Sequence, residues 1–216
     1  MIKAIIFDFD GVIVDSEKIW LNTKINTLKK CNIKINKKKK LNSYLGVSSA
    51  VFFKDIIFKK KEYVDNIKYI QKTYKELTKK SFKKIPSLNK GLFSILKIKK
   101  LNKGIVSNNS KKFIIDCLRH HNILKFFKKN CIVALKGSSF QKPSPFGYVR
   151  GLKMLKCMPS EVIVIEDSEN GIKAAKRARI KNIFKYNPAI LQKKKRSKFV
   201  KNINSFSEIL KYKSLT

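Results

Sequence analysis

The chain has 216 residues, of which 51 are Lys or Arg and 14 are Asp or Glu, so its formal net charge at pH 7 is +37. A hydrophobic fraction of 43% supplies enough apolar material for a real core, which excludes a disordered basic tail protein. Because no apolar run approaches the roughly 18 residues of a membrane span, and carboxylates cut off the one at the amino end, we expect no membrane partner and no signal peptide. The four cysteines are widely spaced, so we expect reduced thiols in a cytoplasmic protein, without a zinc site.

Lysine supplies almost all of the positive charge, and two interpretations of that charge stay open. Lys, Ile, Asn and Phe are all abundant here and share A/T-rich codons, which favours compositional drift at tolerant surface positions. The alternative is nucleic-acid binding, because a field this positive attracts any polyanion. Proteins that bind nucleic acid usually rely on Arg, whose planar group contacts phosphate and guanine through paired hydrogen bonds, and Arg is scarce here. We favour drift and expect no specific nucleic-acid partner.

The first part of the chain predicts one buried strand followed by a helical segment. Residues 3–9 form an Ile-rich apolar run that ends in Asp8-Phe9-Asp10-Gly11, which is typical of a buried parallel strand with function at its carboxyl end. Apolar residues then recur at mixed three- and four-residue steps, which predicts helices over 16–31, 48–60 and 63–80. Pro86 breaks this pattern, and no strand is predicted before it.

After Pro86 the pattern alternates between helices and short apolar strands. Helices are predicted over 88–100, 111–121, 144–156 and 170–179. Strands are predicted over 103–107, 130–135, 161–165 and 181–184. Such alternation is typical of a parallel sheet with helices on both faces. The predicted fold class is therefore α/β, with a Rossmann-like parallel sheet in residues 1–16 and 83–216 and a small all-helical domain, residues 17–82, inserted after the first strand.

Polar clusters follow the predicted strands, at the edge where an open α/β sheet binds ligands. In the first cluster, Asp8 and Asp10 are two apart on extended backbone and point to the same side. One such carboxylate can attack phosphorus while the other moves a proton, although an ordinary strand-end turn is the alternative. In the second cluster, Ser107-Asn108-Asn109-Ser110 places hydroxyls and backbone N–H groups at a helix start. That arrangement either binds an anion or simply caps the helix.

The other two clusters add a cation and further carboxylates. Lys142-Pro143-Ser144-Pro145 places one lysine on a rigid loop, and only the prolines single it out from the many lysines of the chain. The alternative is that this segment is simply a loop that starts the next helix. Glu166-Asp167-Ser168-Glu169-Asn170-Gly171 follows an apolar strand, where carboxylates can bind a hard cation such as Mg²⁺. Helix capping by Asp167 or Ser168 is the alternative there.

The order of these motifs, D-x-D-G-V-x-x-D-S, S-N-N-S, K-P-S-P and E-D-S-x-x-G, resembles the haloacid dehalogenase-like hydrolase superfamily. More narrowly it is similar to the branch with β-phosphoglucomutase and small sugar-phosphate phosphatases. The resemblance implies a Mg²⁺-dependent phosphatase that hydrolyses a small phosphorylated metabolite, such as a sugar phosphate, through an aspartyl-phosphate. It also makes residues 17–82 a cap domain. We expect a monomer, and the resemblance does not name the substrate.

The same resemblance implies a catalytic role for each motif. Asp8 would be the nucleophile and Asp10 the general acid/base, and a carboxylate at this second position argues for phosphoryl transfer over dehalogenation. Ser107 and the backbone of Asn108 would hold the phosphate oxygens. Lys142 would neutralise charge on the nucleophile and on the phosphoryl group.

The implied metal ligands complete the site. Mg²⁺ would be held by the side chains of Asp8 and Asp167 and the carbonyl of Asp10, with Glu166 either a direct ligand or an outer partner. Elementary electrostatics agrees with this arrangement. A carboxylate cannot approach a phosphate dianion unless a metal ion and a lysine first cancel the repulsion.

Two positions of the predicted cap bear on the choice between phosphatase and mutase. In the mutases the cap loop G-V-S is followed by an arginine, and the first cap helix carries a histidine; here those places hold Ser49 and Trp20. A serine cannot contact a phosphate in a bidentate way, and an indole cannot replace an imidazole. We therefore predict a phosphatase and take both as candidate substrate-binding residues, with helix packing the equal alternative for Trp20. The alternatives are a phosphoglucomutase-type phosphoryl transferase, with Lys54 supplying the charge, and a basic polyanion-binding protein that retains the fold.

Overall fold

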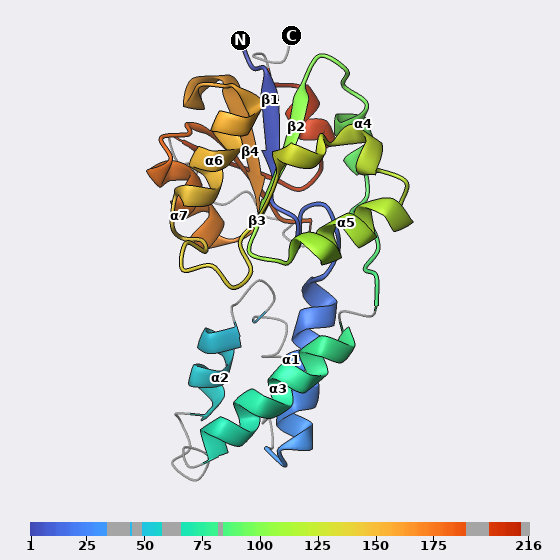
Figure 1. The fold of residues 1–216 in the computed structure, drawn as a ribbon, viewed down its shortest axis with the longest axis vertical. Coiled ribbons are helices and arrows are strands. Elements are labelled where there is room, and N and C mark those ends of the chain that lie inside the picture. Colours follow the sequence, from blue (N-terminus) through green and yellow to red (C-terminus); the bar gives the residue numbers. More distant parts are fainter. Residues whose placement is uncertain (34–43, 45–48, 58–65, 82–83, 189–198, 213–216) are drawn as a thin grey trace. The chain divides into compact units, whose positions relative to one another are not determined.

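The computed structural model describes residues 1–33, 44, 49–57, 66–81, 84–188 and 199–212. The chain divides into two compact units, Met1–Asp15 with Ser87–Thr216, and Ser16–Pro86 (Figure 1). Within its described residues the second unit contains only helices, namely α1 (Glu17–Lys30), α2 (Ser49–Ile57) and α3 (Ile67–Ser81). In the described part of the chain, no helix combines the length and the apolar character that crossing a membrane requires.

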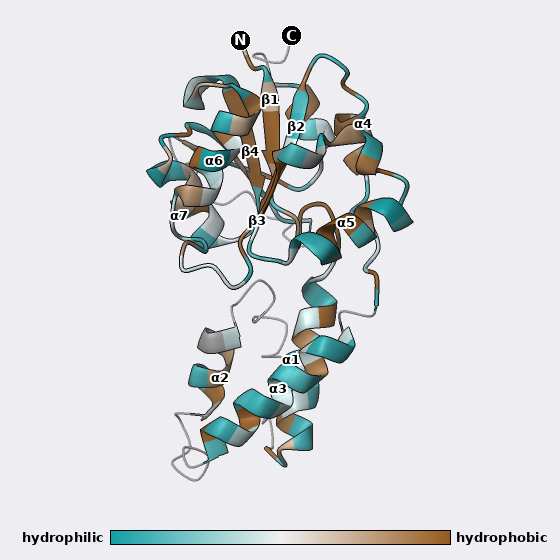
Figure 2. Ribbon diagram, viewed as in Figure 1, coloured by the Kyte–Doolittle hydropathy of each residue, from teal (hydrophilic) through white to brown (hydrophobic). Residues whose placement is uncertain are grey.

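A six-stranded parallel sheet forms the centre of the first unit, in the order β3-β2-β1-β4-β5-β6. Its strands are β1 (Ala4–Phe7), β2 (Asn102–Ser107), β3 (Ile132–Ala134), β4 (Val162–Glu166), β5 (Asn182–Tyr186) and β6 (Val200–Ile203). All residues of β1 and β4 are buried, which explains why both are apolar up to Glu166 at the end of β4 and why both have the hydrophobic colour in Figure 2. The predicted Rossmann-like α/β fold class is confirmed.

Helices cover both faces of this sheet (Figure 1). On one face, α6 (Phe146–Leu155) and α7 (Glu169–Arg177) pack on the alternate strand residues that include Ala4, Ile6 and Val164. On the other face lie α4 (Leu92–Leu96) and α5 (Lys111–His120), and α8 (Ser207–Leu210) packs against α4. Short 3₁₀ segments occur at Leu124–Phe126, Lys129–Cys131 and Pro159–Glu161. The sheet is therefore buried on both sides, and its strand ends are the places left for polar residues.

The second unit has an apolar core of its own. Leu21 and Leu28 of α1, Phe52 of α2 and Ile70 of α3 belong to one buried cluster. The ring of Phe52 meets that of Tyr44 edge to face, with 5.0 Å between the ring centroids. The described helices thus share a core formed within residues 16–86.

Several elements differ from the sequence prediction. β6 was not predicted because only Val200 and Ile203 of its V-K-N-I sequence are buried, which leaves no apolar run to detect. The helix predicted over 88–100 is restricted to the five residues of α4. Parts of two predicted helices lie outside the described residues. These parts are residues 48 and 58–60 of the helix predicted over 48–60, and residues 63–65 of the helix predicted over 63–80.

Candidate active site

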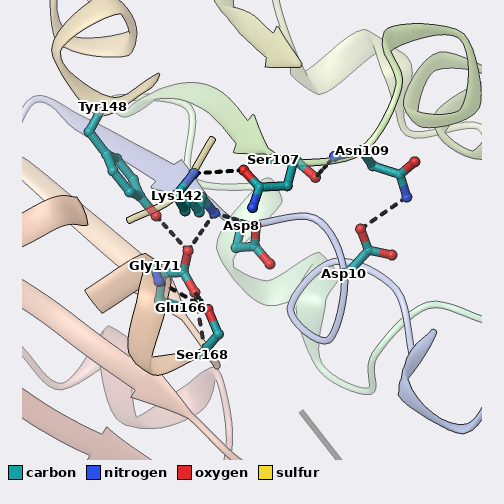
Figure 3. A network of polar contacts seen from close by, with 10 residues as sticks. Asp8, Asp10, Ser107, Asn109, Lys142, Tyr148, Glu166, Ser168 and Gly171 are labelled. Carbon is teal, nitrogen blue, oxygen red and sulfur yellow. Dashed lines mark hydrogen bonds and ion pairs between the residues drawn. The ribbon is translucent and has the colours of Figure 1, made fainter. Parts of the chain in front are cut away.

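The predicted motifs meet at the carboxyl ends of three adjacent strands. The pairing register places Phe7 of β1 opposite Ile105 of β2 and Ile165 of β4, so Asp8 leaves the sheet beside the ends of both neighbours. The strand order also reverses at β1, since the chain continues to β2 on one side and returns to β4 on the other. Ligands of open α/β sheets bind at such switch points. Figure 3 shows the side chains gathered there.

A tight turn after β1 presents the two aspartates. Gly11 has φ of 78°, a conformation that glycine adopts without strain. Its N–H donates to the carbonyl of Val14 at 2.8 Å, and the side-chain amide of Asn89 donates to the carbonyls of Gly11 and Val12 at 2.9 and 3.0 Å. Asn89, which lies just before α4, thus holds the turn after β1. The sequence analysis did not identify this residue.

Lys142 connects the first motif to the last. Its Nζ lies 2.5 Å from Asp8 Oδ1 and 2.5 Å from Glu166 Oε1, and the residue is only 8% exposed. Burial by itself lowers the pKa of Lys142, but the two carboxylates outweigh burial and raise that pKa above its usual range. The side chain is therefore a permanent ammonium at neutral pH, held between two acids.

The loop that carries Lys142 is fastened at two places. The N–H of Lys142 donates to Asn108 Oδ1 at 2.9 Å, which joins the second and third motifs. The guanidinium of Arg177 donates to the carbonyl of Pro143 at 2.9 Å, and the Lys142–Pro143 peptide bond is cis. Asn108, itself exposed, thus holds the loop through its side chain.

Glu166 is fully buried and accepts hydrogen bonds on both carboxylate oxygens. Oε1 accepts from Lys142 and from the hydroxyl of Tyr148 at 2.7 Å, while Oε2 accepts from the backbone N–H and the hydroxyl of Ser168 at 3.2 and 3.0 Å. Sequence reasoning missed Tyr148. The available signal was a tyrosine on the buried face of α6, because a buried tyrosine hydroxyl needs a polar partner.

Asp10 is held from the end of β2. The side-chain amide of Asn109 donates to Asp10 Oδ2 at 3.0 Å, and the N–H of Asn109 donates to Ser107 Oγ at 3.0 Å. Ser107 is buried, whereas Asp10 is partly exposed. The predicted phosphate-binding serine and the predicted acid/base therefore share one neighbour, Asn109, which the sequence had not singled out.

The acidic residues form a donor set that fits a hard cation. Asp8, Glu166 and Asp167 can each offer a carboxylate oxygen, with these oxygens within 4.8 Å of one another. Burial raises the pKa of Asp8, Lys142 opposes this effect, and the carboxylates of Glu166 and Asp10 add to it, so that together they raise the pKa of Asp8 to about 8. A divalent cation would stabilise so much negative charge in a buried place, and Mg²⁺ prefers oxygen ligands.

The two predicted cap residues belong to the other unit. Trp20 lies on α1 and Ser49 begins α2, and both are half-buried. The Gly46-Val47-Ser48 loop before Ser49 lies outside the described residues. Hydrogen bonds, ion pairs and the shared donor set thus bring together seven predicted residues in the first unit: Asp8, Asp10, Ser107, Asn108, Lys142, Glu166 and Asp167.

Residues 5–185 match the haloacid dehalogenase-like hydrolase family. The chain belongs to this family. Among its relatives is the phosphorylated carbohydrates phosphatase of Thermotoga maritima, 26% identical over 187 residues, which are 84% of each chain. The predicted family and hydrolase class are confirmed.

Solved structures show the same haloacid dehalogenase-like fold. A haloacid dehalogenase-like protein of unknown function from Agrobacterium tumefaciens matches with a TM-score of 0.77 at 20% identity, over 97% of this chain and 96% of that one. A β-phosphoglucomutase from Clostridium difficile matches with a TM-score of 0.68 at 24% identity, over 97% and 96% of the two chains. The relatives and solved structures thus include proteins of the predicted branch, namely a phosphatase of phosphorylated carbohydrates and a β-phosphoglucomutase.

Proposed function

We propose that this hydrolase is a Mg²⁺-dependent phosphatase of small phosphorylated metabolites, of the sugar-phosphate class, which acts through an aspartyl-phosphate. The observation that carries the proposal is the buried carboxylate of Asp8, which pairs with the ammonium of Lys142 and belongs to one acidic group with Glu166 and Asp167. The name of the Thermotoga maritima relative supports the substrate class. Residues 16–86 take the part of the cap domain in this proposal.

In the first step a carboxylate oxygen of Asp8 attacks phosphorus, and the bond from phosphorus to the leaving alcohol breaks. Asp10 gives its proton to the leaving oxygen. In the second step Asp10 takes a proton from water, which attacks phosphorus and releases inorganic phosphate and the free Asp8 carboxylate. These roles match a nucleophile and an acid/base two residues apart at the same strand end.

The phosphoryl oxygens are held by the end of β2. Ser107 Oγ already accepts from the N–H of Asn109, so its own proton is directed to another acceptor. A phosphoryl oxygen is that acceptor in the proposed complex, together with the backbone N–H of Asn108. Lys142 neutralises charge as the nucleophile and the phosphoryl group approach each other. Positioning and charge stabilisation supply most of the catalysis of phosphoryl transfer.

Asp8, Asp167 and the carbonyl of Asp10 would hold Mg²⁺. When bound, this ion supplies the positive charge that lets an anionic nucleophile approach a phosphate dianion. Glu166 would not contact the ion directly, because each of its two carboxylate oxygens already accepts two hydrogen bonds from the protein. Its role is to fix Lys142 and the start of α7.

Turnover of p-nitrophenyl phosphate with and without Mg²⁺ tests the proposal. Asp8→Asn keeps the shape and removes the nucleophilic charge, so we expect a rate at least about 1,000-fold lower, which corresponds to several kcal/mol of barrier. The matched control is Asp116→Asn, which removes an exposed carboxylate on α5 that pairs with Lys112. Activity that survives a chelator, or an active Asp8→Asn variant, contradicts the assignment. A panel of phosphorylated sugars then identifies the substrate.

A further inference from the structure

Asn109 joins two parts of the site that lie 99 residues apart in the sequence. Its amide Nδ2 donates to Asp10 Oδ2 at 3.0 Å (Figure 3). Asn109 is the second residue after β2, and it is only 8% exposed. Asn109 has no role in the proposed mechanism, although it contacts Asp10, the proposed acid/base.

The orientation of the Asn109 amide is set by its other contacts. Its Oδ1 accepts from the N–H of Ser110 at 2.8 Å, which fixes the side of the amide that carries the oxygen. The backbone of Asn109 is held separately, because its carbonyl accepts from the N–H of Lys136 at 3.4 Å. A flipped amide would place an oxygen against the carboxylate of Asp10 and an NH₂ group against the N–H of Ser110, which are two repulsive contacts. The NH₂ group is therefore held toward Asp10 before any substrate binds.

The hydrogen bond from Asn109 to Oδ2 suits a carboxyl group that exchanges a proton at Oδ1. An ionised Asp10 accepts this hydrogen bond at Oδ2, and so does a protonated Asp10 whose proton sits on Oδ1. The contact therefore survives both halves of the reaction while it prevents the carboxyl group from rotating. A small displacement of a proton donor costs much of its catalytic effect.

We propose that Asn109 is the positioning residue of Asp10: it holds Oδ2, so that Oδ1 delivers the proton to the leaving-group oxygen. This inference rests on the proposed function. As the bond from phosphorus to the leaving oxygen breaks and the bond from Asp8 to phosphorus forms, the proton on Asp10 Oδ1 moves to the leaving oxygen. Asn109 itself exchanges no proton and touches no substrate.

A comparison of leaving groups tests this role. p-Nitrophenyl phosphate releases a stabilised anion that needs little protonation, whereas phenyl phosphate releases a more basic one. We expect Asn109→Ala to raise the ratio of kcat/KM for p-nitrophenyl phosphate to that for phenyl phosphate by about tenfold, a fraction of the 10² to 10⁴ that a general acid contributes. The parameter kcat/KM is used because it reports the step that forms the aspartyl-phosphate.

Three further variants separate positioning from a structural role. Asn109→Asp keeps an acceptor for Ser110 N–H but places an oxygen that repels the carboxylate of Asp10 where the donor was, so the ratio should rise at least as much as in Asn109→Ala. Asn102→Ala, an exposed asparagine at the opposite end of β2, should leave the ratio unchanged. In an Asp10→Asn background, Asn109→Ala should no longer change the ratio, since residues that act as a unit are not additive.

The outcomes are distinguishable. Equal slowing of both substrates by Asn109→Ala and Asn109→Asp, or an unchanged ratio in folded variants, overturns the positioning role while Asp8-dependent turnover stands. Thermal unfolding of each variant shows that it is folded. If instead Asp8→Asn hydrolyses both substrates as fast as the parent, the proposed function fails, and the role of Asn109 fails with it.

Discussion

Gly11 and Asp167 approach each other so closely that a β-carbon on Gly11 would lie 2.0 Å from Asp167 Oδ2. The two residues follow neighbouring strands, β1 and β4, at the same edge of the sheet. No side chain fits at that distance. Gly171 has the same relationship with Glu166, whose Oε1 would lie 1.8 Å from an added β-carbon. The absence of a side chain at Gly11 and at Gly171 therefore leaves room for the carboxylates of Asp167 and Glu166.

The first prediction compares two glycines with the same backbone conformation. Gly11 has φ of 78° and Gly137 has φ of 79°, but nothing lies within 4 Å of a β-carbon added to Gly137. Each glycine-to-alanine change should lower the free energy of unfolding by about 1 to 2 kcal/mol, because an L side chain is strained at positive φ. Only Gly11→Ala also displaces Asp167, so it alone should lose phosphatase activity, by about 100-fold. Urea unfolding and kcat/KM measure the two effects, and similar activities of the two variants would contradict the role given to Gly11.

Much of the site was predictable because each motif directly follows an apolar strand. Asp8, Ser107 and Glu166 occupy strand ends, and parallel pairing in register is enough to bring strand ends together. Contacts between a helix and a strand end could not be predicted in this way. Tyr148 reaches Glu166 through the packing of α6 on the sheet, and Asn109 reaches Asp10 through its side-chain rotamer. Neither contact produces a repeating pattern of residue types in the sequence from which it could be predicted.

The strands likewise include some that could be predicted from the sequence and one that could not. β1 and β4 were recognisable because burial on both faces demands an unbroken apolar run. β6 pairs with β5 at the sheet edge, and only its first and last residues, Val200 and Ile203, are buried, so it has neither an apolar run nor an alternation to detect. Strand content alone also does not give the order of the strands, which places β1 at the switch point.

Removal of the Tyr148 hydroxyl is the second prediction. Tyr148→Phe keeps the buried ring and removes the donor to Glu166 Oε1, so one of the four hydrogen bonds that hold this carboxylate is lost. Because Glu166 positions the ammonium of Lys142, we expect kcat to fall by about tenfold. A hydrogen bond to a charged group contributes about 1.5 to 3 kcal/mol, so stability should fall as well.

The control for Tyr148→Phe is Tyr212→Phe. The hydroxyl of Tyr212 donates to Asn182 Oδ1 at 3.0 Å, where β5 begins and away from the carboxyl ends of the strands. This variant also loses one hydrogen bond, and it should lose stability without losing activity. Equal kcat values for the two variants would show that Tyr148 only supports the fold.

The third prediction concerns metal binding without turnover. A ligand that binds only the folded state stabilises it by RT ln(1 + [L]/Kd), which is about 2.7 kcal/mol at 100 times Kd. Mg²⁺ should therefore raise the melting temperature of the parent protein, and Asp167→Asn should remove most of that shift. Asp116→Asn is the matched control and should respond to Mg²⁺ like the parent. A shift of the same size in Asp167→Asn would place the cation elsewhere.

The last prediction separates hydrolysis from phosphoryl return. A mutase must give the phosphoryl group back to a sugar that already carries a second phosphate, so its cap needs a fixed cation for that group. Ser49 begins α2 with a hydroxyl that cannot contact phosphate in a bidentate way, and Lys54 of the same helix is exposed on a flexible stem. With β-glucose 1-phosphate and a trace of the bisphosphate, free phosphate should therefore accumulate faster than glucose 6-phosphate. Asp8→Asn should form neither product, which ties both to the same nucleophile. Glucose 6-phosphate forming faster than phosphate in the parent would instead mean that water is kept out until the sugar returns, and the protein would then be a mutase.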